Sequence, residues 1–278
     1  MSDSRPIGVF DSGVGGLTVL QEVRRQLPSE RLVYLADLAH FPYGPRPQTE
    51  VRRLALGIID TLSSLETKLV VIACNTATAA ALNTARERFD IPVVGVIAPG
   101  AQAAAAATRN GRIGVISTEG TLRSQEYVHA IKEANPLATV LGVAAPGLVE
   151  LVEEGSADTT MAEAALHEVV TPVLDWGADT LVLGCTHYPL LRRALARVVR
   201  GRRLRVIDSA ETTAARVGRI LEVNRLQSPR SSPGGVEVLV TAAPRRFTET
   251  AARLFGDEIP VARVIARRAP LLSAVPLS

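Results

Sequence analysis

LVVIACNT, residues 69–76, and LVLGCTH, residues 181–187, are built alike: an aliphatic run, then a cysteine, then polar residues. Short runs this rich in Val, Ile and Leu are typical of strands buried on both faces of a parallel sheet. The two cysteines of the chain, Cys74 and Cys185, are therefore expected where such strands end, at the edge where parallel sheets bind ligands. Two thiols in equivalent places suggest a matched pair of acid/base groups.

An internal repeat extends this likeness. IGVFDS, residues 7–12, resembles IGVIST, residues 113–118, and each copy precedes its cysteine by a similar distance. A repeat much longer than a solenoid unit predicts an α/β protein of two similar lobes. We expect each lobe to be a mainly parallel sheet flanked by helices, the lobes to be related by pseudo-two-fold symmetry, and the active site to lie between them.

Apolar runs and helical stretches alternate along the chain, as in parallel sheets with crossover helices. We expect residues 1–97 and 210–278 to form the first lobe and residues 98–209 the second. The expected strands lie near residues 6–10, 31–36, 69–73, 92–96, 112–116, 138–143, 179–183, 204–207 and 236–241. Helices are expected from about residues 16, 48, 76, 121, 147, 159 and 189, and at 101–107, 210–226 and 245–255.

Three segments are expected to interrupt this pattern. Ala98-Pro99-Gly100 is expected to break the chain before the alanine-rich helix at 101–107. Residues 227–235, rich in Ser, Pro and Gly, are predicted to form a flexible loop. The tail after Arg267 is predicted to be poorly ordered.

The composition bounds the class of protein. The chain has 278 residues, 47% of them hydrophobic, enough for one large or two modest cores. No apolar stretch approaches the ~20 residues that cross a bilayer, and residues 1–6 lack the apolar region of a signal peptide. We therefore expect a cytoplasmic protein without a membrane role.

The cysteines have three alternative uses. A structural disulfide is disfavoured because the cytosol is reducing and the two strand ends are separate. A metal site is not expected, because two lone cysteines and four scattered histidines show no zinc-ligand spacing. Both thiols could be small buried hydrophobes, but their polar neighbours argue against this.

Positive charge is concentrated in one stretch. Residues 192–205 contain seven arginines and no acid, in a chain of net charge +3. This stretch could bind nucleic acid or an acidic partner. We favour the solvated face of a helix and expect no nucleic-acid partner, since no aromatic residues interleave and no nucleic-acid motif accompanies it.

The loop after the first strand is suited to a small ligand. DSGVGGL, residues 11–17, is expected to open a helix, so that its glycines allow close approach and its amides face an anion. Its spacing matches neither the Walker pattern nor G-x-G-x-x-G, and Asp11 would repel a phosphate. A carboxylate or an amino group fits better than a nucleotide.

Polar residues follow both cysteines. Asn75 and Thr76 come after Cys74, and Thr186 comes after Cys185. Such groups can orient a substrate, and a helix N-terminus is expected to lower the thiol pKa below its free value of ~8.5. Helix capping is the structural alternative for each residue singly.

Three titratable residues are candidate partners of the thiols. Asp11 is expected beside the Cys74 strand, and His187 comes two residues after Cys185. Glu153 could add a further carboxylate or could simply be a solvated glutamate at a helix end. Pro42-Tyr43-Gly44-Pro45 cannot be helical and suits a pocket wall or lid, although alone it would be only a turn.

These motifs resemble those of the glutamate racemases, cofactor-independent enzymes of the aspartate/glutamate racemase superfamily. The resemblance rests on FDSGVGGL at residues 10–17, PYG at 42–44, CNTAT at 74–78 and GCTHYPL at 184–190, and covers about residues 5–220. It implies interconversion of L- and D-glutamate, which supplies D-glutamate for bacterial peptidoglycan, with no cofactor and no metal. Residues after Gln227 are only loosely similar, and TAAP at 241–244 departs from the family pattern.

The resemblance also implies roles for single residues. Cys74 would remove the α-proton of D-glutamate and Cys185 that of L-glutamate, the opposite thiol returning a proton each time. Asp11, Glu153 and His187 correspond to residues that assist proton transfer. The positions corresponding to substrate-binding residues are Asp11, Ser12, Tyr43, Gly44, Asn75, Thr76, Thr186 and His187. Thr118, which ends the second copy of the repeat as Ser12 ends the first, is a further binding candidate.

Elementary chemistry agrees with these roles. Racemisation needs a base on one face of a tetrahedral carbon and an acid on the other, which two thiols from facing lobes supply. No pyridoxal lysine motif is evident to delocalise the carbanion, so preorganised donors in a closed, water-poor cleft must stabilise it. We expect closure of the lobes to gate turnover.

Other functions remain open on the sequence alone. An aspartate or hydantoin racemase would use the same two thiols with a different side-chain pocket. Two-lobed α/β folds also occur in non-catalytic amino acid or anion binding proteins. The arginine stretch could mediate salt-sensitive association with an acidic protein. For the partners, we expect glutamate as the substrate and a homodimer, whose arrangement the sequence does not specify.

Overall fold

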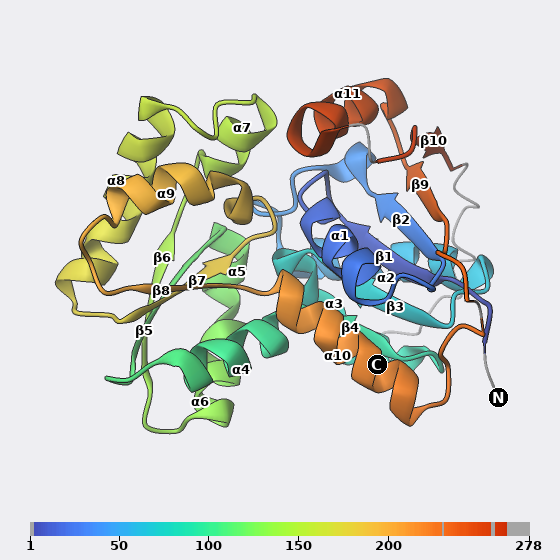
Figure 1. Cartoon of the computed structure of the whole chain (residues 1–278), viewed down its shortest axis with the longest axis horizontal. Coiled ribbons are helices and arrows are strands. Elements are labelled where there is room, and N and C mark those ends of the chain that lie inside the picture. Colours follow the sequence, from blue (N-terminus) through green and yellow to red (C-terminus); the bar gives the residue numbers. More distant parts are fainter. Residues whose placement is uncertain (1–2, 230, 257–258, 266–278) are drawn as a thin grey trace.

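Two separate parallel sheets lie side by side in the structure (Figure 1). The computed structural model describes residues 3–229, 231–256 and 259–265. The first sheet has the order β10-β9-β2-β1-β3-β4 and the second the order β6-β5-β7-β8, and every strand pair in both is parallel. We call each sheet with its covering helices a lobe. The two-lobed α/β class is confirmed.

The strands lie close to their predicted positions. In the first lobe they are β1 (Ile7–Asp11), β2 (Leu32–Ala36), β3 (Leu69–Ile72), β4 (Val93–Gly95), β9 (Val236–Val240) and β10 (Arg263–Val264). In the second lobe they are β5 (Arg112–Ser117), β6 (Thr139–Ala144), β7 (Thr180–Gly184) and β8 (Arg205–Asp208). The two-residue β10 was not predicted, because so short a segment carries no periodicity.

Helices cover both faces of both sheets. They are α1 (Leu17–Gln26), α2 (Gln48–Ser64), α3 (Asn75–Arg88), α4 (Ile97–Ala107), α5 (Glu119–Ser124), α6 (Glu126–Ala134), α7 (Leu148–Glu153), α8 (Thr160–Asp175), α9 (Arg192–Val198), α10 (Ala210–Val223) and α11 (Pro244–Phe255). Two 3₁₀ turns, η1 (Leu38–His40) and η2 (Tyr188–Leu191), complete the described elements.

Burial on both faces explains the aliphatic runs. Successive residues of a strand point to opposite faces, so Val9 joins the core under α1, α10 and α11, whereas Phe10 joins the core with α2 and α3. In the second lobe, Ile116 packs with α7, α8 and α9, and Val115 packs with α4 and α6. The expectation of strands without polar faces is confirmed for the central strands β1, β3 and β7, whose residues are all buried.

The two lobes share a strand order. In the first, β2-β1-β3-β4 repeats the order of β6-β5-β7-β8 in the second, and the repeated segments begin β1 and β5. Cys74 follows β3 and Cys185 follows β7, which hold the same place in the two orders. This agreement supports the pseudo-two-fold relation, which stays a prediction.

Three expectations about helices are wrong. Ala98-Pro99-Gly100 does not break the chain but belongs to the first turn of α4, where a proline is tolerated because its missing N–H has no intrahelical partner. The helix expected from residue 121 is two helices, since Gln125 adopts φ 58°, in the left-handed region. The helix expected from residue 189 starts as the turn η2, and α9 begins only at Arg192.

The segment predicted as a loop has neither helix nor strand in its described residues, 227–229 and 231–235. Its ends are hydrogen-bonded to the first lobe: the Asp3 N–H donates to the Gln227 carbonyl at 3.0 Å, and the Leu32 N–H donates to the Gly235 carbonyl at 2.9 Å. Its flexibility stays a prediction. The tail after Arg267 lies outside the described residues.

The arginine stretch is partly neutralised by its own chain. Only residues 192–198 of this stretch are helical. The ion pairs link Arg192 to Asp208, Arg193 to Asp158, and Arg197 to Asp158 and Glu163. This pairing favours the solvated helix face over a site for an acidic partner. In the part of the chain that the structure describes, no helix is both long and apolar enough to span a membrane.

Candidate active site

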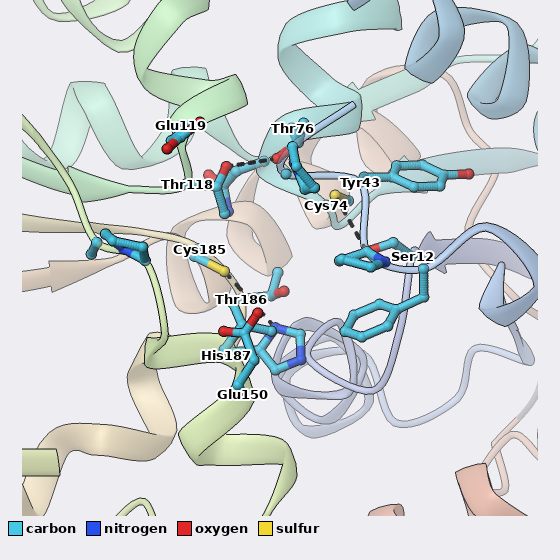
Figure 2. A pocket seen from close by; sticks show the side chains of 18 of the residues that line it. Ser12, Tyr43, Cys74, Thr76, Thr118, Glu119, Glu150, Cys185, Thr186 and His187 are labelled. Carbon is cyan, nitrogen blue, oxygen red and sulfur yellow. Dashed lines mark hydrogen bonds between the residues drawn. The ribbon is translucent and has the colours of Figure 1, made fainter. Parts of the chain in front are cut away.

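A pocket of about 210 Å³ lies where the carboxyl ends of the two sheets meet (Figure 2). The first lobe lines it with residues 11–12, 41–45 and 74–76, and the second with residues 118–119, 145–147, 149–150 and 185–187. Both cysteines and every predicted substrate-binding residue are among these. The predicted meeting of two cysteine loops in one cavity therefore agrees with the geometry.

Cys74 ends the loop after β3 and caps α3. Its Sγ accepts the N–H of Ala77 at 3.5 Å and lies 4.0 Å from Ser12 Oγ. Cys74 is only 6% exposed and is not part of a disulfide. The sulfur thus meets the pocket at a helix N-terminus, as the sequence predicted.

The predicted fall in thiol pKa is wrong for Cys74. Burial raises its pKa well above the usual value, and the nearby Asp11 carboxyl raises it further. The Ala77 N–H acts in the predicted direction but is outweighed, because a buried anion loses its hydration. Cys74 is therefore held as a protonated thiol, which suits a proton donor.

Cys185 belongs to a chain of polar contacts. Its Sγ lies 3.8 Å from His187 Nδ1, and His187 Nε2 lies 3.2 Å from Glu153 Oε1. Burial lowers the pKa of His187, but the contacts with Cys185 and Glu153 and the charge of Asp11 outweigh it and raise the pKa from 6.5 to about 10. A protonated imidazole therefore lies beside the second sulfur at neutral pH.

Asp11 lies at the end of β1, and one of its oxygens is already used. Oδ2 accepts the N–H groups of Gly16 at 3.0 Å and Gly13 at 3.3 Å, so the anion that these amides face is the chain's own carboxylate. The buried Oδ1 has no hydrogen-bond partner within the described residues. The pKa of Asp11 is raised, because the effect of burial exceeds the opposing effects of His187 and the two amides. Asp11 can thus present an acceptor to an ammonium group.

Tyr43 forms part of the wall but turns its hydroxyl away from the cysteines (Figure 2). That hydroxyl donates to Asp37 Oδ2 at 2.7 Å. The neighbouring Gly44 carbonyl accepts the N–H of Gly120 from the second lobe at 3.0 Å. Residues 43–44 therefore offer ring and backbone to a ligand and join the two lobes.

Amide and hydroxyl groups surround the remaining space. Asn75 Nδ2 is buried without a partner in the described part of the chain, whereas its Oδ1 accepts the Tyr127 hydroxyl at 2.8 Å. Thr76 Oγ1 lies 2.9 Å from Thr118 Oγ1 across the pocket (Figure 2). The Thr186 carbonyl accepts the Thr18 hydroxyl at 3.3 Å. The Asn75 amide and the hydroxyls of Thr76 and Thr118 are donors suited to binding carboxylates.

Glu153 is the one predicted site residue that does not line the pocket. It lies at the end of α7, behind His187, and its side chain is only 14% exposed. Because Glu153 contacts His187 Nε2, the alternative of a solvated glutamate at a helix end does not apply. Among the described residues, no group of three or more His, Cys, Asp or Glu is placed to hold a metal ion.

Several pocket residues were not predicted: Phe41, Glu119, residues 145–147, Val149 and Glu150. The loop at 145–147 carried a usable signal, since it follows the strand expected at 138–143 and the ends of parallel strands meet at one edge. Phe41 and Glu119 carried none beyond their nearness to Tyr43 and Thr118.

The chain matches a family of known proteins. The model of the family described as Asp/Glu/Hydantoin racemase matches residues 7–217. The glutamate racemase of Geobacter metallireducens is 45% identical over 255 residues, which cover 92% of this chain and 94% of that protein.

Solved structures are similar over nearly the whole chain. A glutamate racemase isoform of Bacillus anthracis has a TM-score of 0.89 and 38% identity, with 94% of this chain and 97% of that chain covered. The glutamate racemase of Francisella tularensis in complex with D-glutamate has a TM-score of 0.88 and 30% identity, covering 96% and 99%.

Proposed function

Because the chain belongs to the Asp/Glu/hydantoin racemase family, we propose that it interconverts L- and D-glutamate with Cys74 and Cys185 as its two bases. The observation that carries this proposal is the pocket that both thiols line, one from each lobe. A substrate held between them exposes opposite faces of one carbon to two different sulfurs. The reaction then needs no swing of a single base around the stereocentre.

The substrate is proposed from the relatives and from the pocket. Relatives that are 41–46% identical are named glutamate racemases, and a similar structure was solved with D-glutamate. A glutamate has two carboxylates and one ammonium group. Asn75, Thr76 and Thr118 offer donors for the carboxylates, and Asp11 Oδ1 offers an acceptor for the ammonium.

In the proposed mechanism, D-glutamate reacts with the form in which Cys74 is a thiolate and Cys185 a thiol: Cys74 takes the α-proton, and Cys185 returns one to the other face. L-glutamate reacts with the opposite form, in which Cys74 is the protonated thiol, and the roles are reversed. Asp11 assists at Cys74, and His187, oriented by Glu153, assists at Cys185. The carbanion is stabilised by donors that are already in place around the carboxylate. Exclusion of water by the lobes strengthens these contacts.

The cellular role is part of the same proposal. The product D-glutamate would serve peptidoglycan synthesis in the cytoplasm, and the active form would be a homodimer. We also retain the division into lobes at residues 1–97 with 210–278 and 98–209, and the gating of turnover by lobe closure. A rate insensitive to viscosity and to substitutions at the lobe hinge would count against gating.

A racemisation assay tests the function. The protein is expected to racemise both glutamate enantiomers, and aspartate and hydantoins much more slowly, as followed by circular dichroism or chiral chromatography. In deuterium oxide, the α-hydrogen of the product is expected to be deuterium, since each sulfur exchanges its proton with solvent. A faster reaction with aspartate or a hydantoin would favour the rival racemases, and binding without exchange would favour a binding protein.

We predict that Glu153→Gln moves the alkaline limb of the kcat profile to lower pH. Burial lowers the His187 pKa, and the Cys185 and Glu153 contacts together raise it to about 10, so the imidazole stays protonated until the pH approaches that value. Loss of the Glu153 charge lowers this pKa, and the protonated form disappears earlier as the pH rises. Glu154→Gln, at the exposed neighbour, is the matched control. Identical profiles for both variants would contradict the role of Glu153.

A further inference from the structure

Tyr127 lies behind both cysteine loops, although it is not among the residues that line the pocket. It belongs to α6 of the second lobe and is 3% exposed. Its hydroxyl donates to Asn75 Oδ1, beside Cys74, at 2.8 Å. Its ring edge would lie 3.1 Å from a Cβ on Gly184, the residue before Cys185. One side chain thus touches the supports of both sulfurs.

The direction of the Tyr127 hydrogen bond decides which end of the Asn75 amide faces the ligand. Burial raises the pKa of Tyr127, so the phenol keeps its proton. A hydrogen-bond contact with Ser209 lowers that pKa in part, but burial outweighs it. The protonated phenol is the donor in the bond to Asn75 Oδ1.

The hydrogen bond from Tyr127 fixes the orientation of the Asn75 side-chain amide. With Oδ1 engaged by Tyr127, the NH₂ group is the part of Asn75 left without a partner among the described residues, and it is buried at the pocket wall. The flipped amide would turn an oxygen towards a bound carboxylate and leave the phenol without an acceptor. A buried donor or acceptor without a partner is destabilising, so the flipped orientation is disfavoured.

We propose that Tyr127 is a positioning residue for substrate binding: it holds the Asn75 amide from the opposite lobe so that Nδ2 donates to a substrate carboxylate. This inference rests on the proposed racemisation of glutamate. Since Tyr127 and Asn75 belong to different lobes, the amide is oriented correctly only when the lobes are joined as they are here. Binding of the anionic substrate is thereby coupled to the arrangement of the lobes.

Tyr127→Phe tests the inference, because it keeps the ring and removes only the hydroxyl. We expect KM for both glutamate enantiomers to rise about 10-fold, with a smaller change in kcat, since the lost donor orientation weakens ground-state and transition-state binding alike. A purely structural role would reduce the folded fraction, which lowers kcat and leaves KM unchanged. That pattern, or no change at all, would overturn the proposal.

The matched control is Thr67→Val. It also removes a buried hydroxyl that donates a hydrogen bond, here to the Leu62 carbonyl at 3.1 Å, at the opposite end of the first sheet from the pocket. Its KM and kcat are expected to equal those of the unaltered protein. Thermal unfolding of both variants checks that each is folded at the assay temperature.

A double-variant cycle isolates the route through Asn75. Asn75→Ala is expected to raise KM by itself, and adding Tyr127→Phe is expected to raise it no further, because the amide that Tyr127 orients is already absent. If KM of the double variant rises by the product of the two single-variant effects, the proposal is overturned. An unaltered protein that fails to racemise glutamate overturns the proposed function and this inference together, whereas an active protein with an indifferent Tyr127→Phe overturns the inference alone.

Discussion

Replacing either cysteine by serine is expected to lower the kcat for glutamate racemisation by about 1,000-fold or more. Cys74 and Cys185 approach the pocket from different lobes, and in the proposed mechanism each serves one face of the substrate carbon. A serine hydroxyl is a much weaker acid than a thiol and cannot replace the missing proton transfer at neutral pH. Retention of more than a tenth of the activity by either variant would contradict the two-base mechanism.

Exchange of the α-hydrogen with deuterium oxide assigns the two sulfurs. With Cys74→Ser, L-glutamate is expected to exchange slowly through the intact Cys185 while D-glutamate does not. With Cys185→Ser the pattern is expected to reverse. Each variant is the control of the other, since the chain contains only these two cysteines. The opposite pattern, measured by proton NMR, would exchange the roles of the two residues.

Gly15→Ala is expected to lower kcat/KM by about 100-fold or more, although Gly15 is not among the residues that line the pocket. A Cβ at this position would lie 2.4 Å from His187 Nδ1 and 2.5 Å from Thr186 Oγ1, distances that side chains do not tolerate. His187 cannot move away and keep its contacts, because it lies between Cys185 and Glu153. The imidazole must shift, and its contact with the Cys185 sulfur is lost.

Gly57→Ala provides the control for this substitution. Gly57 lies within α2, and no atom lies within 4 Å of a Cβ built there. Alanine is a better helix former than glycine by about 1 kcal/mol, so the melting temperature is expected to rise while kcat/KM is unchanged. Equal activity of Gly15→Ala and Gly57→Ala would show that the His187 position is not critical.

The strands and the cysteine loops could be predicted from the sequence because their signals are local. An aliphatic run such as residues 69–72 is buried on both faces whatever its neighbours are, and the residue after it must lie at the edge of the sheet. The repeat at residues 7–12 and 113–118 then predicted two similar lobes, each with a cysteine at the edge of its sheet. By contrast, the positive φ of Gln125, which divides α5 from α6, could not be predicted, because the residue is not a glycine.

Contacts between distant segments could not be predicted. The pairs His187–Glu153 and Tyr127–Asn75 join residues from separate elements, and only the packing of those elements brings them within 3.2 Å and 2.8 Å. The direction of the Cys74 pKa failed for the same reason. A local helix end predicted a lower value, and the burial that raises it is a property of the whole fold.

The order of residues along the chain, by itself, determined the two parallel sheets, the place of each thiol at a strand end and the polar residues beside it. Periodicity and strand-end geometry act over a few residues, so these features need no knowledge of the partner lobe. Only the tertiary structure decided that Glu153 reaches His187, that Tyr43 donates to Asp37 and that burial raises the pKa of Cys74. Hydrogen bonding and desolvation depend on which atoms surround a group in space, and that is settled only when the lobes pack together.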